Sequence, residues 1–242
     1  MTTKIFPDYE TLSRATADLI NNYITGKPAS LVCIASGHTP VGVFQNLIKD
    51  IQSSKLDIGQ CTFLSLDEWV GIDSNDSGSC LSMLKKDFFD PLNIPATQTE
   101  FFDVQTTDLQ KECDRINTLI EKNGGLDIML VGVGTNGHIG MNEPGTSFHS
   151  YAHIGDLAEE TKTAGQKYFS KQTKLSKGMT LGLKHLQEAK LPIVMANGEK
   201  KAAIMGKAVS QKPTELIPVT IVHLISQGYI MLDKEAASGI RT

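Results

Sequence analysis

The sequence predicts an α/β fold with a doubly wound, mostly parallel sheet and helices on both faces. Five short runs of mostly apolar, often branched residues recur along the chain without the strict alternation of a sheet that has one wet face. Between them lie longer stretches with apolar residues near every third or fourth position, the spacing of helices that cover such strands. No repeat or linker divides the chain, so residues 1–242 are expected to form one domain.

The order of the elements follows from these two patterns. Strands are expected at the apolar runs 31–35, 61–66, 126–131, 191–196 and 229–232. Helices are expected where the period is helical, at 8–23, 40–51, 79–89, 108–122 and 200–209. Strands that alternate with helices form βαβ crossovers, which make the sheet parallel. The polar stretch 147–177 has few strand signals and is expected to be a connection or a lid.

The composition excludes several classes of function. Lys and Arg number 23 against 27 Asp and Glu, for a formal net charge of −4, whereas nucleic-acid and anionic-membrane binders carry a basic surplus. No apolar segment approaches the roughly 18 residues that span a bilayer, and the N-terminal MTTKIFPDYE lacks the pattern of a secretory signal. We therefore expect a cytoplasmic protein with neither nucleic acid nor membrane as a partner.

Cysteines and histidines give no sign of a metal centre. The four cysteines are far apart in sequence and form no CxxC pair, so we expect buried free thiols. His149 and His153 have i, i+4 spacing but lack the HExxH arrangement and a clear helical period. No metal site is predicted.

A possible anion site follows the first predicted strand. Ser36, Gly37, His38 and Thr39 form the turn, and Pro40 suits the first turn of the helix that follows. Helix-start N–H groups, the helix dipole and the hydroxyls of Ser36 and Thr39 suit a phosphate or another anion. A plain turn capped by Thr39 explains the same residues equally well, and the P-loop pattern GxxxxGK[ST] is absent.

Two adjacent carboxylates, Asp67 and Glu68, follow the second predicted strand. Adjacent side chains at a strand end diverge, so one can face a cleft while the other supports the structure. A partly desolvated carboxylate there can act as a general base, because burial raises its pKa toward neutral pH. A helix cap or a surface ion pair is the alternative for such a pair on its own.

The most specific segment is residues 130–145, LVGVGTNGHIGMNEPG, with five glycines among sixteen residues. Such a backbone can approach a small ligand closely. His138 and Glu143 are near enough in sequence to pair, which would orient the imidazole and raise its basicity. A satisfied core histidine is the alternative, but this glycine density has no packing use.

Lysines follow the fourth predicted strand. Lys200 or Lys201 lies near the start of the next helix, where a cation is locally unfavourable. An anionic ligand would relieve this mismatch, and a solvated pair of lysines is the alternative. Strand ends of an open α/β sheet share one edge, so all four segments are expected to meet there.

Taken together, these segments resemble the glucosamine-6-phosphate deaminase/isomerase family, in the superfamily that includes the 6-phosphogluconolactonases. The resemblance runs from about residue 31 to residue 238. Its strongest element is GVGTNGHIGMNEPG, and SGHTP, FLSLDEW, MTLGLKHL and NGEKKA support it. The NEPG continuation, and Trp69 where a lactonase would carry Arg after Asp-Glu, favour the deaminase branch.

The resemblance implies that glucosamine 6-phosphate, or its C4 epimer galactosamine 6-phosphate, reacts with water to give a ketose 6-phosphate and ammonia. No cofactor is implied, and the partner is this small amino-sugar phosphate. The matching positions make Asp67 the base that moves a proton between C2 and C1, and His138 the residue that assists ring opening. Glu143 matches the charged partner of the histidine and Asn136 a positioning residue, with Glu68 and Gly137 in support.

For the phosphate group, the resemblance implies binding by residues 36–39, Lys201 and Lys167. Lys167 and Lys162 stand where the family has arginine, which keeps the charge but loses the planar bidentate fork. Family members often form homo-oligomers. The fold also leaves two alternatives, a lactone hydrolase of the 6-phosphogluconolactonase type and a non-catalytic sugar-phosphate sensor.

Overall fold

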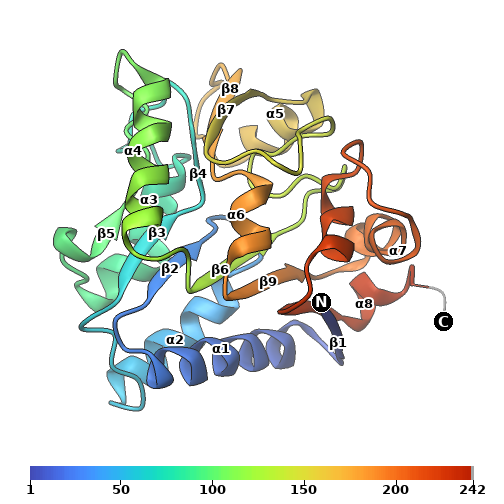
Figure 1. The fold of residues 1–242 in the computed structure, drawn as a ribbon, viewed down its shortest axis with the longest axis horizontal. Coiled ribbons are helices and arrows are strands. Elements are labelled where there is room, and N and C mark those ends of the chain that lie inside the picture. The colour runs from blue at the N-terminus through green and yellow to red at the C-terminus, as the bar shows by residue number, and fades with distance from the viewer. Residues whose placement is uncertain (241–242) are drawn as a thin grey trace.

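The computed structural model describes residues 1–240, whose centre is a seven-stranded sheet (Figure 1). All neighbouring strands pair in parallel, which confirms the predicted fold class. In spatial order the strands are β1 (Thr2–Phe6), β10 (Tyr229–Asp233), β9 (Leu191–Ala196), β6 (Ile128–Gly132), β2 (Leu31–Ile34), β3 (Thr62–Ser65) and β5 (Thr99–Glu100). The two edge strands, β1 and β5, were not predicted, because one is half polar and the other has two residues.

Helices cover both faces of the sheet. They are α1 (Tyr9–Gly26), α2 (Val41–Gln52), α3 (Cys80–Leu84), α4 (Leu109–Lys122), α6 (Leu183–Glu188), α7 (Ala202–Ser210) and α8 (Lys234–Ala237), with a π turn at Lys85–Phe89 that continues α3. Side chains alternate along each strand, so Val32 and Ile34 pack with α1, α2 and α3, while Leu31 and Cys33 join the core under α4, α6 and α7. Each face therefore has its own apolar core.

A second, smaller sheet lies beyond the carboxyl ends of the main strands. Its antiparallel order is β4 (Asp67–Trp69), β8 (Lys177–Thr180) and β7 (His153–Asp156), and α5 (Glu159–Gln166) follows β7. The expected connection at 147–177 thus contains a strand and a helix. The strand was missed because its sequence, HIGD, has no apolar alternation and is held by main-chain pairing to β8.

The strand order creates a crevice between β2 and β6. From β2 the chain continues outward to β3 and β5, returns to β6 beside β2, and then continues in the other direction to β9 and β10. The loops after β2 and β6 consequently leave the sheet toward opposite sides. Ligands bind at such switch points in open α/β sheets, and the segments singled out in the sequence lie here.

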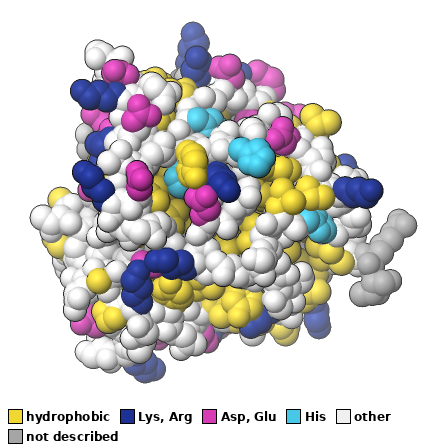
Figure 2. All heavy atoms as spheres, in the orientation of Figure 1, with side chains coloured by type: hydrophobic (Ala, Val, Ile, Leu, Met, Phe, Trp, Pro, Cys, Tyr) yellow, Lys and Arg dark blue, Asp and Glu magenta, His cyan; other side chains and the backbone are white. Residues whose placement is uncertain are grey.

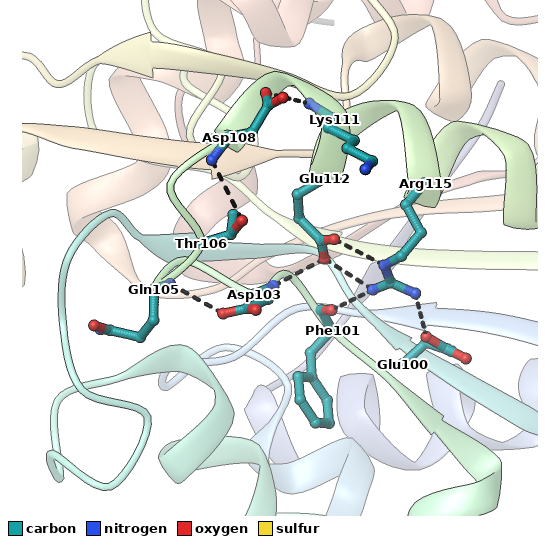
Figure 3. A network of polar contacts seen from close by, with 9 residues as sticks. All are labelled: Glu100, Phe101, Asp103, Gln105, Thr106, Asp108, Lys111, Glu112 and Arg115. Atoms are coloured by element: carbon teal, nitrogen blue, oxygen red, sulfur yellow. Dashed lines mark hydrogen bonds and ion pairs between the residues drawn. The ribbon is translucent and has the colours of Figure 1, made fainter.

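A polar network anchors α4 to the β5 edge of the sheet (Figure 3). The guanidinium of Arg115 forms a two-pronged pair with Glu112, with both N···O distances 2.8 Å. It also donates to Glu100 at 2.8 Å and to the carbonyl of Phe101 at 2.9 Å. The loop between β5 and α4 joins the network through Asp103, whose main-chain N–H donates to Glu112 Oε1 at 2.9 Å and whose Oδ1 accepts from the main-chain N–H of Gln105 at 3.0 Å. The network thus connects β5, this loop and α4.

Three further observations bear on the sequence expectations. All four cysteines are free and buried, as predicted. On the face drawn in Figure 2, Lys and Arg side chains are interspersed with Asp and Glu, without one basic patch. Among residues 1–240, no helix combines the length and apolarity needed to span a membrane.

Candidate active site

A cavity of about 800 Å³ opens at the switch point, beyond the carboxyl ends of the strands. The four segments predicted to meet at this edge all line it: residues 36–39, Asp67 with Trp69, residues 132–136 with His138, and residues 197–201. Residues of α5 and the turn after it complete the wall. The cavity is within the size range of small-molecule sites.

Asp67 is a buried carboxylate on the cavity wall, 8% exposed. It opens β4, where main-chain pairing to Thr180 of β8 fixes its position. Burial raises the pKa of Asp67 to about 7, the charge of Glu68 adds to the rise, and the Cys80 thiol partly offsets it. The carboxyl group therefore takes up and releases a proton near neutral pH, which suits a general base.

Glu68 faces away from the cavity and has a structural role. Its Oε1 accepts from the main-chain N–H groups of Trp69 and Cys80, and its Oε2 accepts from that of Leu81, each at 2.9 Å. The carboxylate thus ties the start of α3 to β4 and holds the segment next to Asp67. The expected divergence of the two carboxylates is present in the structure.

The loop after β6 depends on two glycines. Gly134 has no side chain because the imidazole of His138 lies against it: a Cβ there would approach the ring to 2.3 Å. Gly137 has φ +90°, a conformation that glycine adopts at little cost, and its N–H donates to the Gly134 carbonyl. This tight turn brings the side chain of His138 into the cavity wall.

His138 contacts three polar groups. Its main-chain N–H donates to Asn136 Oδ1 at 3.0 Å, its Nδ1 lies 3.1 Å from Thr161 Oγ1, and the same nitrogen is 3.7 Å from Glu143 Oε2. Asn136 in turn donates to that carboxylate oxygen at 3.0 Å. Glu143 Oε1 is buried without a hydrogen-bond partner in the described chain. Asn136 and Thr161 therefore fix the histidine from two sides.

The net effect on the basicity of His138 differs from the expectation. Burial lowers the pKa of His138, and the charge of Lys201 lowers it further. Glu143 does raise the pKa, as expected, but the desolvation of the ring outweighs this contribution. The pairing with Glu143 therefore acts in the predicted direction, while the net shift of the pKa of His138 is downward.

The turn after β2 keeps its polar groups toward the cavity. Pro40 is the N-cap of α2 and no side chain caps this helix, so the alternative of a turn capped by Thr39 is excluded. One helix-start donor is nevertheless occupied: the Gly42 N–H donates to the hydroxyl of Tyr9, which also donates to the Thr39 carbonyl. The N–H groups open to an anion are thus fewer than the sequence suggested.

Two lysines converge on the cavity. Lys201 precedes α7 and is half-buried; desolvation lowers its pKa, and the charge of Lys167 lowers it further. No carboxylate of residues 1–240 forms an ion pair with either lysine (the pairs found are those of Arg14, Lys27, Arg115, His138, Lys162, Lys177, Lys184 and Lys190). Lys162 instead pairs with Glu159 and does not line the cavity.

Sequence reasoning missed three contributors to the cavity: Cys80, Thr161 and Tyr168. Cys80 and Thr161 touch the two titratable groups, and the Tyr168 hydroxyl lies over the turn after β2. Cys80 lies in the helix predicted at 79–89 and Thr161 in α5, and nothing in their local sequence indicates that these side chains reach the cavity. The one signal in the sequence is that Tyr168 directly follows Lys167, which was predicted to bind the phosphate group.

Comparisons with known proteins point to one family. Residues 9–231 match the family model of glucosamine-6-phosphate isomerases/6-phosphogluconolactonase. A relative from Bacillus pumilus named glucosamine-6-phosphate deaminase is 34% identical over 96% of this chain and 97% of its own length. Another of that name, from Clostridium novyi, is 32% identical over the same shares of the two chains.

Solved structures show the same fold. A monomeric glucosamine-6-phosphate deaminase superposes with a TM-score of 0.95 at 32% identity, over 99% of this chain and 100% of its own. The 6-phosphogluconolactonase from Trypanosoma brucei gives a TM-score of 0.79 at 18% identity, over 99% and 98% of the two chains. The second similarity concerns the fold alone.

Proposed function

Since the chain belongs to the family of glucosamine-6-phosphate isomerases and 6-phosphogluconolactonases, we propose that it is an amino-sugar-phosphate deaminase. The proposed reaction converts glucosamine 6-phosphate and water to the ketose 6-phosphate and ammonia. One observation carries this proposal: a buried carboxylate, Asp67, lines the cavity with its pKa raised to about 7. Proton transfer between adjacent sugar carbons needs such a base, and binding alone does not.

The phosphate group of the substrate is proposed to bind at residues 36–39, Lys167 and Lys201. Lys201 carries a charge in a desolvated position beside Lys167, which costs free energy without an anion. A phosphate dianion between the two lysines offsets this repulsion. Hydroxyls of Ser36 and Thr39 supply further donors at the cavity wall. The anchored phosphate positions the sugar ring toward Asp67 and His138.

Ring opening is assigned to His138. Its pKa is lowered, so the neutral imidazole can accept the proton of the anomeric hydroxyl and return it to the ring oxygen as the bond between C1 and that oxygen breaks. Glu143 stabilises the imidazolium formed between the two steps, 3.7 Å from Nδ1. Asn136 and Thr161 hold the ring in position.

Asp67 then acts on the open-chain sugar. Its carboxylate removes the proton from C2, which gives an enolamine between C1 and C2, and returns a proton to C1. The C2–N bond becomes an iminium, water adds to C2, and ammonia leaves as the ketone forms. The burial that raises the pKa of Asp67 also makes its carboxylate a stronger base toward C2 than an exposed aspartate would be.

The test is a parallel assay of ammonia and ketose 6-phosphate release from glucosamine 6-phosphate and galactosamine 6-phosphate. 6-Phosphogluconolactone serves as the control substrate. We expect ammonia from an amino sugar and no lactone hydrolysis, and the faster sugar identifies the preferred C4 epimer. Lactone hydrolysis without ammonia would establish the lactonase instead. Binding without turnover of any of the three would establish a sensor.

Two broader proposals follow. The substrate and product are phosphorylated sugars that do not cross a membrane unaided, and this supports a cytoplasmic hydrolase and isomerase of amino-sugar metabolism. The residues that line the cavity come from segments between positions 35 and 201, within one proposed domain of residues 1–242, and a related solved structure is that of a monomeric deaminase. Catalysis is therefore proposed to be complete in a single copy, whether or not copies associate.

A further inference from the structure

An unassigned contact lies at the rim of the cavity, between two segments 130 residues apart in sequence. Nδ1 of His38 lies 3.1 Å from the hydroxyl of Tyr168. The two rings stack with centroids 5.3 Å apart and an interplanar angle of 30°. His38 belongs to the turn after β2, while Tyr168 follows α5. The contact connects the proposed phosphate turn to the segment that lies over it.

Tyr168 is held firmly enough to orient its partner. Its main-chain N–H donates to the Gly165 carbonyl, which fixes the turn that carries it. A Cβ at Gly37 would lie 3.3 Å from the tyrosine hydroxyl, so the hydroxyl sits directly over the proposed phosphate turn. Lys167 Nζ lies 5.3 Å from the centroid of the same ring. His38, in contrast, is exposed and has rotational freedom of its own.

The contact bears on the tautomer of the imidazole. Burial raises the pKa of Tyr168, so its hydroxyl keeps its proton, and at 3.1 Å that hydroxyl is within reach either to donate to Nδ1 or to accept from it. A neutral imidazole that accepts at Nδ1 carries its own proton on Nε2. No group of residues 1–240 forms a hydrogen bond with Nε2 of His38. Nε2–H of His38 is then a free donor in this turn. The N–H of Gly42, at the start of the next helix, already donates to the Tyr9 hydroxyl.

We propose that His38 Nε2–H binds the substrate phosphate and that Tyr168 is a positioning residue that fixes the tautomer and orientation of His38. This proposal rests on the proposed function, since it names the atom through which His38 acts in the same phosphate site and the residue that orients it. It also gives the site a neutral, directional donor beside Lys167 and Lys201, which act as point charges. Tyr168 acts through His38 and touches no reacting atom.

The experiment compares Y168F, H38A and the double variant with the unchanged protein. Calorimetry measures the affinity for inorganic phosphate, and steady-state assays measure KM and kcat for the amino-sugar phosphate. The loss of one hydrogen bond predicts about fivefold weaker phosphate binding and a similar rise in KM for Y168F, with kcat nearly unchanged. Because Tyr168 acts through His38, the double variant should bind phosphate no more weakly than H38A.

Y151F is the matched control. It removes the hydroxyl of a 45% exposed tyrosine that bonds Glu188, and it should leave phosphate affinity and KM unchanged. Unchanged phosphate affinity in Y168F, or losses that add in the double variant, would overturn the proposal. Phosphate calorimetry needs no turnover, so a protein that releases no ammonia would defeat the proposed function while these affinities still decide the role of the pair.

Discussion

Asp67 is an ionisable residue at a position that disfavours its ionised form. The carboxyl group is buried on the cavity wall and next to Glu68, and both conditions favour its neutral form. A residue kept for stability would be neutral or paired here. The unfavourable ionised state is the property that makes Asp67 useful as a base, so its cost to folding should be measurable.

Asp67→Asn is predicted to stabilise the protein at alkaline pH. The pKa of Asp67 is about 7 in the folded protein and near 4 in the unfolded chain. The contribution of Asp67 to the free energy of unfolding is therefore fully present below pH 4 and is lost as the pH rises through 7. Three pKa units correspond to at most about 4 kcal/mol at pH 8. Melting temperatures of the variant should exceed those of the parent at pH 8 and converge with them near pH 4.

The comparison needs an exposed aspartate as a control. Asp114 lies on the surface of α4, and Asp114→Asn should shift the melting temperature little and equally at both pH values. The same Asp67→Asn variant should release no ammonia and still bind phosphate. A pH-independent difference in melting temperature would show that Asp67 does not titrate near neutrality.

At the scale of elements, Arg115 adds a polar attachment between α4 and the sheet edge to the apolar packing of the helix. Arg115 reaches Glu112 in its own helix, Glu100 in β5 and the carbonyl of Phe101 (Figure 3). Glu112 is 8% exposed, so the loss of Arg115 leaves a desolvated carboxylate whose remaining partner is the main-chain N–H of Asp103. The network therefore matters more than an exposed ion pair would.

Arg115→Ala is predicted to lower the free energy of unfolding by about 1–3 kcal/mol, the range for a broken buried network. Urea denaturation measures this loss. Arg115→Lys keeps the charge but loses the planar fork of the guanidinium, so its free energy of unfolding should lie between those of the parent and of Arg115→Ala. Since none of these residues lines the cavity, KM should be unchanged in both variants. A stability equal to that of the parent would show that the network contributes nothing.

The elements also show what could be predicted from the sequence. Strand β9 was predicted with its bounds because it is apolar toward both cores, and α1, α2, α4 and α7 were predicted to within three residues because each presents an apolar stripe to one core. Strands β4, β7 and β8 lack such a pattern and depend on pairing with one another. For the same reason, the contacts of Thr161 and Tyr168 could not be predicted, whereas the strand-end turns could.

At the scale of the whole molecule, the cavity is walled by segments from residue 35 to residue 201 of the same chain. Both sheets and α5 contribute to the wall. The related solved structure with 32% identity is that of a monomeric deaminase. The proposal that catalysis is complete in one copy is tested at this scale.

We predict that specific activity is independent of protein concentration. Light scattering on a sizing column gives the oligomeric state, and dilution series of the ammonia assay give the activity across any dissociation that occurs. Constant activity is expected because one copy supplies all the proposed groups. A fall in activity in step with dissociation would show that neighbouring copies complete or stabilise the site.

Trp69 is the only tryptophan of the sequence, and it borders the cavity. Its indole packs edge-on against Phe169 with the centroids 6.3 Å apart, it is 5% exposed, and its N–H donates to the Gly78 carbonyl. Intrinsic fluorescence excited at tryptophan wavelengths therefore comes from one known place. The molecule carries its own optical probe, through which occupancy of the cavity can be followed in solution without a label.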